Sequence, residues 1–147
     1  MRVLVQRIKK AKIRISDTSV AEIEKGMLLF VAIGKEDSDK DIEFLSRKVV
    51  SLRIFEDKDG KMNLSVKDIN GQILSVPQFT LYADTSRGNR PGFELSAGPG
   101  KAKECWERFN VLLKGAGVDV KEGVFGAHME VELVNDGPVT IWLDSRQ

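Results

Sequence analysis

The feature that most constrains the fold is the longest apolar segment, the seven residues 27–33 that follow Gly26. This segment is far shorter than the roughly 20 residues that cross a bilayer, so we predict that it forms a buried strand. The apolar stretch at residues 3–5 is too short for a signal peptide. We therefore expect a cytoplasmic protein.

Four other segments are predicted to be extended. Residues 2–15 and 19–24 alternate between apolar and polar side chains, and residues 53–56 and 72–82 follow later in the chain. Pro77 has no N–H to donate to a neighbouring strand. We therefore expect segment 72–82 to lie at a sheet edge or to be bulged at the proline.

The C-terminal part also has the pattern of strands, because apolar residues alternate over 129–133 and again over 139–143. We interpret residues 135–138, Asn-Asp-Gly-Pro, as a turn between these two strands. A proline directly after a turn glycine is unusual, because a hairpin needs that amide. An X-Pro bond can also be cis at modest cost.

Two helices are predicted. The first begins near Asp39 with Ser38 as its cap, and its apolar stripe consists of Ile42, Leu45, Val49 and Leu52. The second follows a long loop at 84–100 and ends at Gly115 or Gly117. Its buried face consists of Ala102, Cys105, Trp106, Phe109, Leu112 and Leu113. Cys105 is therefore expected to fill the core rather than to act as a nucleophile.

No internal repeat, low-complexity tract or linker interrupts residues 1–147. A chain of this length suits one domain. We predict a single mixed α/β domain with two helices packed on a sheet.

The chain has one cysteine, Cys105, and one histidine, His128. A Cys/His zinc site needs about four such ligands, and this chain supplies only two. We therefore expect no metal and no cofactor. Any serine or cysteine triad would have to use His128.

Three segments are candidates for a site. One is the segment 135–140 described above, where a fixed cis bond would mark a deliberate feature, although a simple turn explains it too. In an extended strand Gln78 and Thr80 would point to the same face, where an amide could hold an oxyanion; alternatively, they are only the polar face of an edge strand. Residues 123–129 contain two glycines, which permit close backbone approach. His128 in this segment is more simply explained as a structural or exposed residue.

The net charge of +1 does not indicate nucleic-acid binding unless cations gather on one face. One basic segment spans residues 7–14. Four further cations flank the loop at 84–100, namely Arg87, Arg90, Lys101 and Lys103. We expect these four to contact RNA, although solvated loops would have the same composition.

Four motifs together resemble the D-aminoacyl-tRNA deacylase family: residues 78–85 (QFTLYADT), 88–91 (GNRP), 125–129 (FGAHM) and 135–140 (NDGPVT). The opening MRVLVQR is similar too, and the resemblance runs essentially end to end. It implies a largely antiparallel, barrel-like sheet with two helices and a homodimer with active sites at the subunit interface.

The resemblance also implies an esterase that removes D-amino acids and glycine from tRNA during proofreading. It places Gln78, Phe79 and Thr80 in the pocket. It makes Gly137-Pro138 a cis pair that enters the partner's pocket and rejects L-amino acids. Three more residues would shape the pocket, namely Gly126, Ala127 and Met129. Arg7 would lie near the Gly-Pro loop.

One position departs from the family pattern, because Pro77 stands where the family usually has serine. A related tRNA deacylase branch also has proline there, but without the phenylalanine that this chain has at position 79. Phe79 and Val139-Thr140 keep the chain with the D-selective members.

The expected mechanism is positioning, since no residue near Thr80 in sequence is an obvious base for a nucleophile. An amide donor, the Phe79 N–H or the Gln78 side chain, would stabilise the oxyanion, and the RNA 2′-hydroxyl would assist. Two rival functions are an RNA-binding module without turnover and a dimeric amino-acid sensor.

Overall fold

The apolar segment predicted as a buried strand forms β3, on which the sheet is built. The computed structural model describes residues 1–147. Its elements in chain order are β1 (Arg2–Ile15), β2 (Thr18–Ile23), β3 (Gly26–Ala32), α1 (Asp39–Ser51), β4 (Phe55–Glu56), β5 (Met62–Leu64), β6 (Gln72–Pro77), the 3-10 helix η1 (Phe79–Tyr82), α2 (Pro99–Gly115), β7 (Asp119–Glu122) and β8 (Glu130–Asp144).

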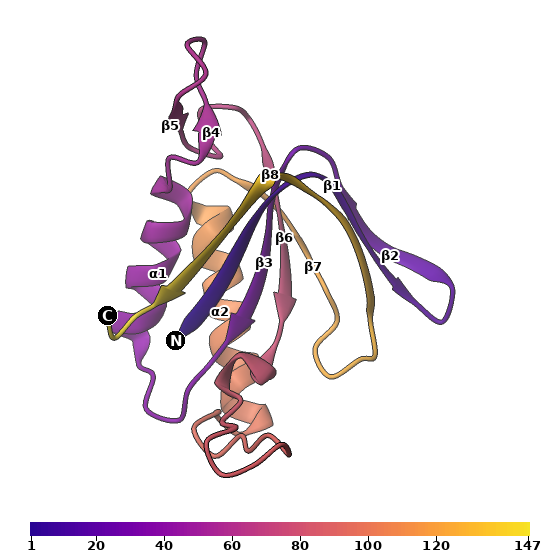
Figure 1. Cartoon of the computed structure of the whole chain (residues 1–147), viewed down its shortest axis with the longest axis vertical. Helices are drawn as coiled ribbons and strands as arrows, with labels where there is room; N and C mark the ends of the chain where they lie inside the picture. The colour runs from indigo at the N-terminus through magenta and orange to yellow at the C-terminus, as the bar shows by residue number, and fades with distance from the viewer.

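The main sheet is mixed and strongly curved. Its strand order is β2-β1-β3-β6-β7, and β8 pairs with β1 on the side away from β3. The first half of β1 pairs with β3 and its last part pairs with β2. The sheet therefore curls into a nearly closed, barrel-like form with both helices on one face, as predicted (Figure 1).

Alternation along β3 divides its side chains between two cores. Met27, Leu29 and Val31 belong to the larger cluster, together with the apolar stripes of α1 and α2. Leu28 belongs to a second cluster on the other face of the sheet, which β1, β2 and β6 complete. This strand is accordingly apolar at every position.

The helices begin and end close to the predicted residues. The Ser38 N–H donates to the Asp41 carboxylate over 2.8 Å at the start of α1. Gly117 follows α2 with a φ of +86°, a conformation that glycine adopts without strain. Cys105 is half-buried on α2, and burial raises the pKa of its thiol, as expected for an unreactive packing residue.

The prediction of a strand over 72–82 was wrong in two respects. β6 ends at Pro77, and residues 79–82 turn into η1. β6 is also an interior strand, because it pairs in parallel with β3 and β7. Pro77 is tolerated because it is the last residue of the strand, beyond its pairing with β7.

The prediction of a turn at residues 135–138 was also wrong. β8 is one continuous strand, and both of its halves pair with β1 on either side of a register shift. The long β1 offers one partner to both halves, so Asn135–Pro138 forms a bulge and the chain does not reverse. The four-residue strand β7 was not predicted. No helix is both long enough and apolar enough to span a membrane.

Candidate active site

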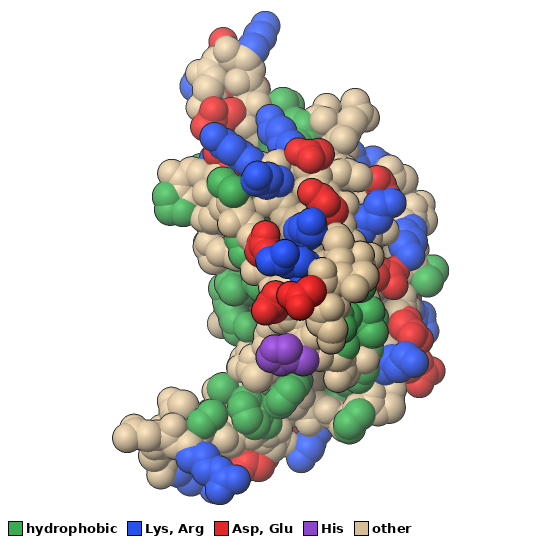
Figure 2. All heavy atoms as spheres, turned by 90° about the vertical axis from the view of Figure 1, so that its right-hand side faces the viewer, with side chains coloured by type: hydrophobic (Ala, Val, Ile, Leu, Met, Phe, Trp, Pro, Cys, Tyr) green, Lys and Arg blue, Asp and Glu red, His purple; other side chains and the backbone are tan.

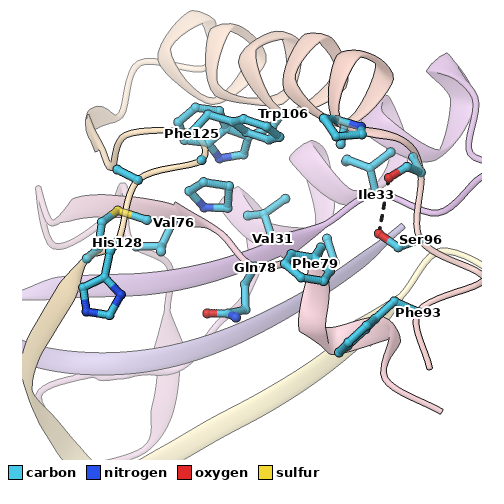
Figure 3. Close-up of a pocket in the computed structure, with 18 of the residues that line it drawn as sticks. Val31, Ile33, Val76, Gln78, Phe79, Phe93, Ser96, Trp106, Phe125 and His128 are labelled. Atoms are coloured by element: carbon cyan, nitrogen blue, oxygen red, sulfur yellow. Dashed lines mark hydrogen bonds between the residues drawn. The ribbon is translucent and has the colours of Figure 1, made fainter. Parts of the chain in front are cut away.

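A cavity of about 610 Å³ opens at the carboxyl ends of the parallel strands β3 and β6. Ligand sites in α/β sheets favour this position. The walls come from the ends of both strands, the loop before α2, the start of α2 and residues 125–129 (Figure 3).

The cavity is mostly apolar and contains two aromatic pairs. Phe79 and Phe93 meet edge to face, with ring centroids 4.9 Å apart. Trp106 and Phe125 lie 6.1 Å apart on another wall (Figure 3). The buried Trp106 donates its indole N–H to Ser75 Oγ over 2.9 Å, which fixes the plane of that wall.

The turn from β6 into η1 brings backbone amides to the cavity. The Gln78 N–H donates to the Val31 carbonyl over 2.7 Å, which ties this turn to β3. The first 3-10 hydrogen bond runs from the Leu81 N–H to the Gln78 carbonyl. The N–H groups of Phe79 and Thr80 precede that bond, so they have no partner within the helix.

Gln78 and Thr80 are neighbours, although the segment is not an extended strand. The Gln78 side-chain amide donates to Thr80 Oγ1 over 2.5 Å. Gln78 and Phe79 line the cavity, whereas Thr80 adjoins it through this hydrogen bond. Among the lining residues the only ionisable side chain is that of the exposed His128. The site therefore holds no carboxylate or amine to activate a nucleophile.

The segment 123–129 supplies the opposite rim. Gly126, with a φ of +77°, Ala127 and Met129 all line the cavity. A Cβ at Gly123 would lie 2.9 Å from Met129 Sδ, so glycine is needed for this close approach. The structure thus brings together five of the predicted residues: Gln78, Phe79, Gly126, Ala127 and Met129.

The Gly137-Pro138 pair lies away from the cavity of its own chain. Both residues are exposed in the bulge of β8, and their peptide bond is cis. The buried Arg7 donates to the Asp136 carbonyl over 3.0 Å and to the Ile54 carbonyl over 2.7 Å. Arg7 therefore holds the bulge against the segment that precedes β4.

The distance between the Gly137-Pro138 bulge and the cavity follows from strand register. Val31, which lines the cavity, pairs with Val3, and Arg7 lies four residues further along β1. At about 3.3 Å per residue, this offset is roughly 13 Å along the strand. The bulge and the cavity are therefore separate sites within one chain.

The four cations predicted to contact RNA are exposed around the loop before α2 and the start of that helix. Arg87 lies 3.8 Å from Glu94, and Lys103 lies 3.8 Å from Glu107. Lys101 donates to the Lys35 carbonyl over 2.6 Å. Only Arg90 makes no ion pair or side-chain hydrogen bond.

Several lining residues were not singled out by the sequence. The helical spacing of Trp106 predicts only a core residue, and the apolar segment predicts only burial for Val31 and Ile33. Phe93 and Ser96 lie in an irregular loop without periodicity. The end of β3, this loop and α2 come into contact only in the folded structure. No local sequence pattern predicts that contact.

Comparisons with known proteins agree along the whole chain. The sequence model of the family described as D-Tyr-tRNA(Tyr) deacylase matches residues 4–144. A protein named D-aminoacyl-tRNA deacylase from Thermotoga petrophila is 57% identical over 99% of this chain and 97% of its own. Another of that name from Thermosipho africanus is 49% identical over 100% and 99%, respectively.

Two solved structures are similar. One, titled c-Myc DNA Unwinding Element Binding Protein, has a TM-score of 0.93 and 36% identity over 98% of each chain. The other, titled a probable eukaryotic D-amino acid tRNA deacylase, has a TM-score of 0.83 and 18% identity over 97% of each chain. The latter likeness concerns the fold alone.

Proposed function

The chain belongs to the D-Tyr-tRNA(Tyr) deacylase family, and on that premise we propose that it hydrolyses the ester of D-aminoacyl-tRNA and of mischarged glycyl-tRNA. The products are the free amino acid and tRNA. The role is proofreading in the cytoplasm, where L-aminoacyl-tRNA must be spared. Relatives named D-aminoacyl-tRNA deacylase, matched over nearly their full length, support this assignment.

The observation that carries the proposal is the chemistry of the cavity. Its walls are largely apolar and aromatic, its one ionisable side chain is His128, and two unpaired backbone amides lie beside it at Phe79 and Thr80. Such a site can bind a small ester and stabilise negative charge on its carbonyl oxygen. It suits an aminoacyl ester, which already hydrolyses slowly in water.

The reaction then proceeds by positioning. Water adds its oxygen to the ester carbonyl carbon, and the Phe79 N–H or the Gln78 amide stabilises the resulting oxyanion. The bond from that carbon to the ribose oxygen breaks, and the proton released by water passes to the ribose oxygen, with assistance from the RNA 2′-hydroxyl. Thr80 shapes the turn and is not the nucleophile.

A homodimer completes the site. Gly137-Pro138 is exposed and lies about 13 Å along the sheet from the cavity of its own chain, so we assign it to the pocket of a second copy. Arg7 holds this segment from behind through the Asp136 carbonyl. A rigid backbone segment held in this way can select a ligand by its shape, without any reactive side chain.

Stereoselectivity follows from steric exclusion by that backbone. An L side chain would point into the inserted Gly-Pro segment, whereas a D side chain would point away from it. Glycine has no Cβ and therefore enters. Different D-amino acids should be accepted alike, because backbone atoms make the selection. Arg87, Arg90, Lys101 and Lys103 border the cavity side of the molecule and contact the 3′ end of the tRNA.

The direct test is multiple turnover. Purified protein at one-hundredth of the concentration of D-tyrosyl-tRNA should release all of the D-tyrosine, and Ala127→Trp, which fills the cavity, should abolish release. The two rival functions predict otherwise. An RNA-binding module would bind without release, and an amino-acid sensor would bind free D-tyrosine without cleaving the ester.

A further inference from the structure

Most of the cations of this chain that have no acidic partner lie toward one end of the molecule. Thirteen Lys and Arg side chains have no carboxylate within 4.0 Å, and nine of them, all exposed, lie toward this end. These nine are Lys9, Lys10, Lys25, Arg47, Lys48, Arg53, Lys58, Lys61 and Lys67, and we call this group the cationic end.

The cationic end lies where β3 and β6 begin, opposite the cavity. Lys25 directly precedes β3, and its carbonyl accepts the N–H of Gln72, the first residue of β6. Arg47 and Lys48 lie in the last turns of α1, which runs back from the cavity end of β3. The hairpin of β4 and β5 projects beyond the body here, with Lys58 and Lys61 in its turn (Figure 1).

Acidic residues at this end offset its charge only in part, because five carboxylates, those of Glu24, Glu56, Asp57, Asp59 and Asp68, stand against the nine cations. Asp57 accepts the backbone N–H groups of Asp59 and Lys61, and Asp68 accepts the N–H and hydroxyl of Ser65. These two carboxylates are held by turns and lie beyond 4.0 Å from any cation, so they keep their charge but form no ion pair. Figure 2 shows Lys and Arg side chains at the tip of the projecting hairpin and just below it. With a net charge of only +1 for the chain, this concentration is local.

Arg7 connects this end to the proposed dimer. One side of its guanidinium binds the Asp136 carbonyl beside Gly137, and the other binds the Ile54 carbonyl at the base of the hairpin. If Gly137-Pro138 enters the pocket of a partner subunit, the hairpin must lie beside the mouth of that same pocket. RNA that leads into the pocket therefore meets the cationic end of the other subunit.

We propose that the cationic end, centred on Lys58 and Lys61, binds the phosphates of the tRNA acceptor stem whose 3′ end occupies the partner's pocket. This inference rests on the proposed function. Each lysine that contacts a phosphate displaces a counterion, so the contribution of this surface should depend on salt. The catalytic step, which takes place in the other subunit, should not.

The test compares Lys58→Ala/Lys61→Ala with Lys35→Ala/Lys40→Ala, a control that removes two exposed, unpaired cations near the opposite end. On D-tyrosyl-tRNA, the hairpin variant should raise KM about fivefold and leave kcat unchanged. It should also make the slope of log(kcat/KM) against log[salt] shallower by about 2. The control should change KM less than twofold. Equal effects of the two variants, or no effect of the hairpin variant, would overturn the proposal.

A short substrate separates this proposal from the function on which it rests. D-tyrosyl adenosine ester lacks the stem, so the wild type and the hairpin variant should hydrolyse it equally. A wild type that cleaves neither substrate contradicts the proposed function instead. In mixed dimers with one pocket blocked by Ala127→Trp, the KM defect should appear only when the lysines are removed from the blocked chain. A defect only from the chain with the open pocket would refute the trans arrangement.

Discussion

The hydroxyl of Thr80 is a candidate nucleophile beside the cavity, and its only side-chain partner is the Gln78 amide at 2.5 Å. An amide cannot remove its proton. We therefore expect Thr80→Ala to keep kcat/KM for D-tyrosyl-tRNA within about tenfold of the wild type, the change reflecting a looser turn. A thousandfold loss in single-turnover rate, with an unchanged circular dichroism spectrum, would make Thr80 the nucleophile.

Asp41 gives a residue-scale prediction of pH dependence. Burial alone would raise its pKa, but hydrogen bonds from Ser145 Oγ and from Ser38 outweigh burial and lower the pKa from 3.8 to about 2. Because the folded state holds the depressed value, the carboxylate stabilises the fold above pH 3.8, and this contribution disappears as the pH falls towards 2.

After solvent screening, the Asp41 contribution to the free energy of unfolding should be on the order of 1 kcal/mol at pH 7. Asp41→Asn should lower stability by that amount at pH 7 and by almost nothing at pH 2. Urea unfolding at the two pH values measures the difference. An equal loss at both would mean that the carboxylate charge is not what stabilises this cap.

Single residues were predictable where a local rule governs them. The Ser38 cap and the apolar stripe on α2 follow from spacing, and the residues around Gln78 and Gly126 follow from the family resemblance. Phe93 and Ser96 were not predictable, because their place in the cavity depends on a loop crossing the end of β3. The sequence also did not show that Arg7 is buried and bonded to two backbone carbonyls.

Gly26 decides how two elements meet, because it pairs with Gln72 where the parallel strands β3 and β6 begin. A Cβ there would lie 1.9 Å from the Gln72 carbonyl oxygen. Gly26→Ala should therefore separate the strands and cost more than about 3 kcal/mol of unfolding free energy.

A matched control for Gly26 is Gly115→Ala at the end of α2, where an added Cβ meets nothing within 4 Å. Alanine favours the helix there and should stabilise the protein by about 0.5 kcal/mol. Chemical denaturation of both variants gives the comparison. If Gly26→Ala proved no less stable than Gly115→Ala, the close approach of β3 and β6 would be wrong.

Arg7 joins the β8 bulge to the segment before β4. Arg7→Lys keeps the charge but loses the planar fork that reaches both carbonyls, so we expect a loss of about 2 kcal/mol in unfolding free energy. We also expect weaker rejection of L-tyrosyl-tRNA. Arg14→Lys is the control, because Arg14 makes only partly exposed ion pairs and should change stability by less than about 1 kcal/mol.

Elements with strong periodicity were predictable, whereas their ends and partners were not. α1, α2 and the first three strands follow from their apolar patterns. The end of β6 at Pro77 and the continuity of β8 through Gly137-Pro138 were missed. The composition of 135–138 predicts a turn, whereas the apolar pattern of 72–82 predicts a strand that continues past Pro77. In both cases pairing with a distant strand, β1 or β3, decided the outcome.

At the scale of the whole molecule, the cavity and the Gly137-Pro138 bulge are far apart in one chain. The proposed function nevertheless requires both to contact the same substrate ester. Two copies reconcile these positions, and the cationic end then borders the same mouth. Under the proposed function, catalysis, chiral selection and RNA binding would come from different surfaces of the fold. Each can be removed separately by the variants described above.

The central claim is that a backbone segment measures the handedness of the substrate. Its most direct measurement is kcat/KM for tRNA(Tyr) charged with D-tyrosine, L-tyrosine or glycine, under identical conditions. We predict efficient release of D-tyrosine, appreciable release of glycine and at least a hundredfold slower release of L-tyrosine. Release of L-tyrosine at a rate within a few-fold of D-tyrosine would contradict the account.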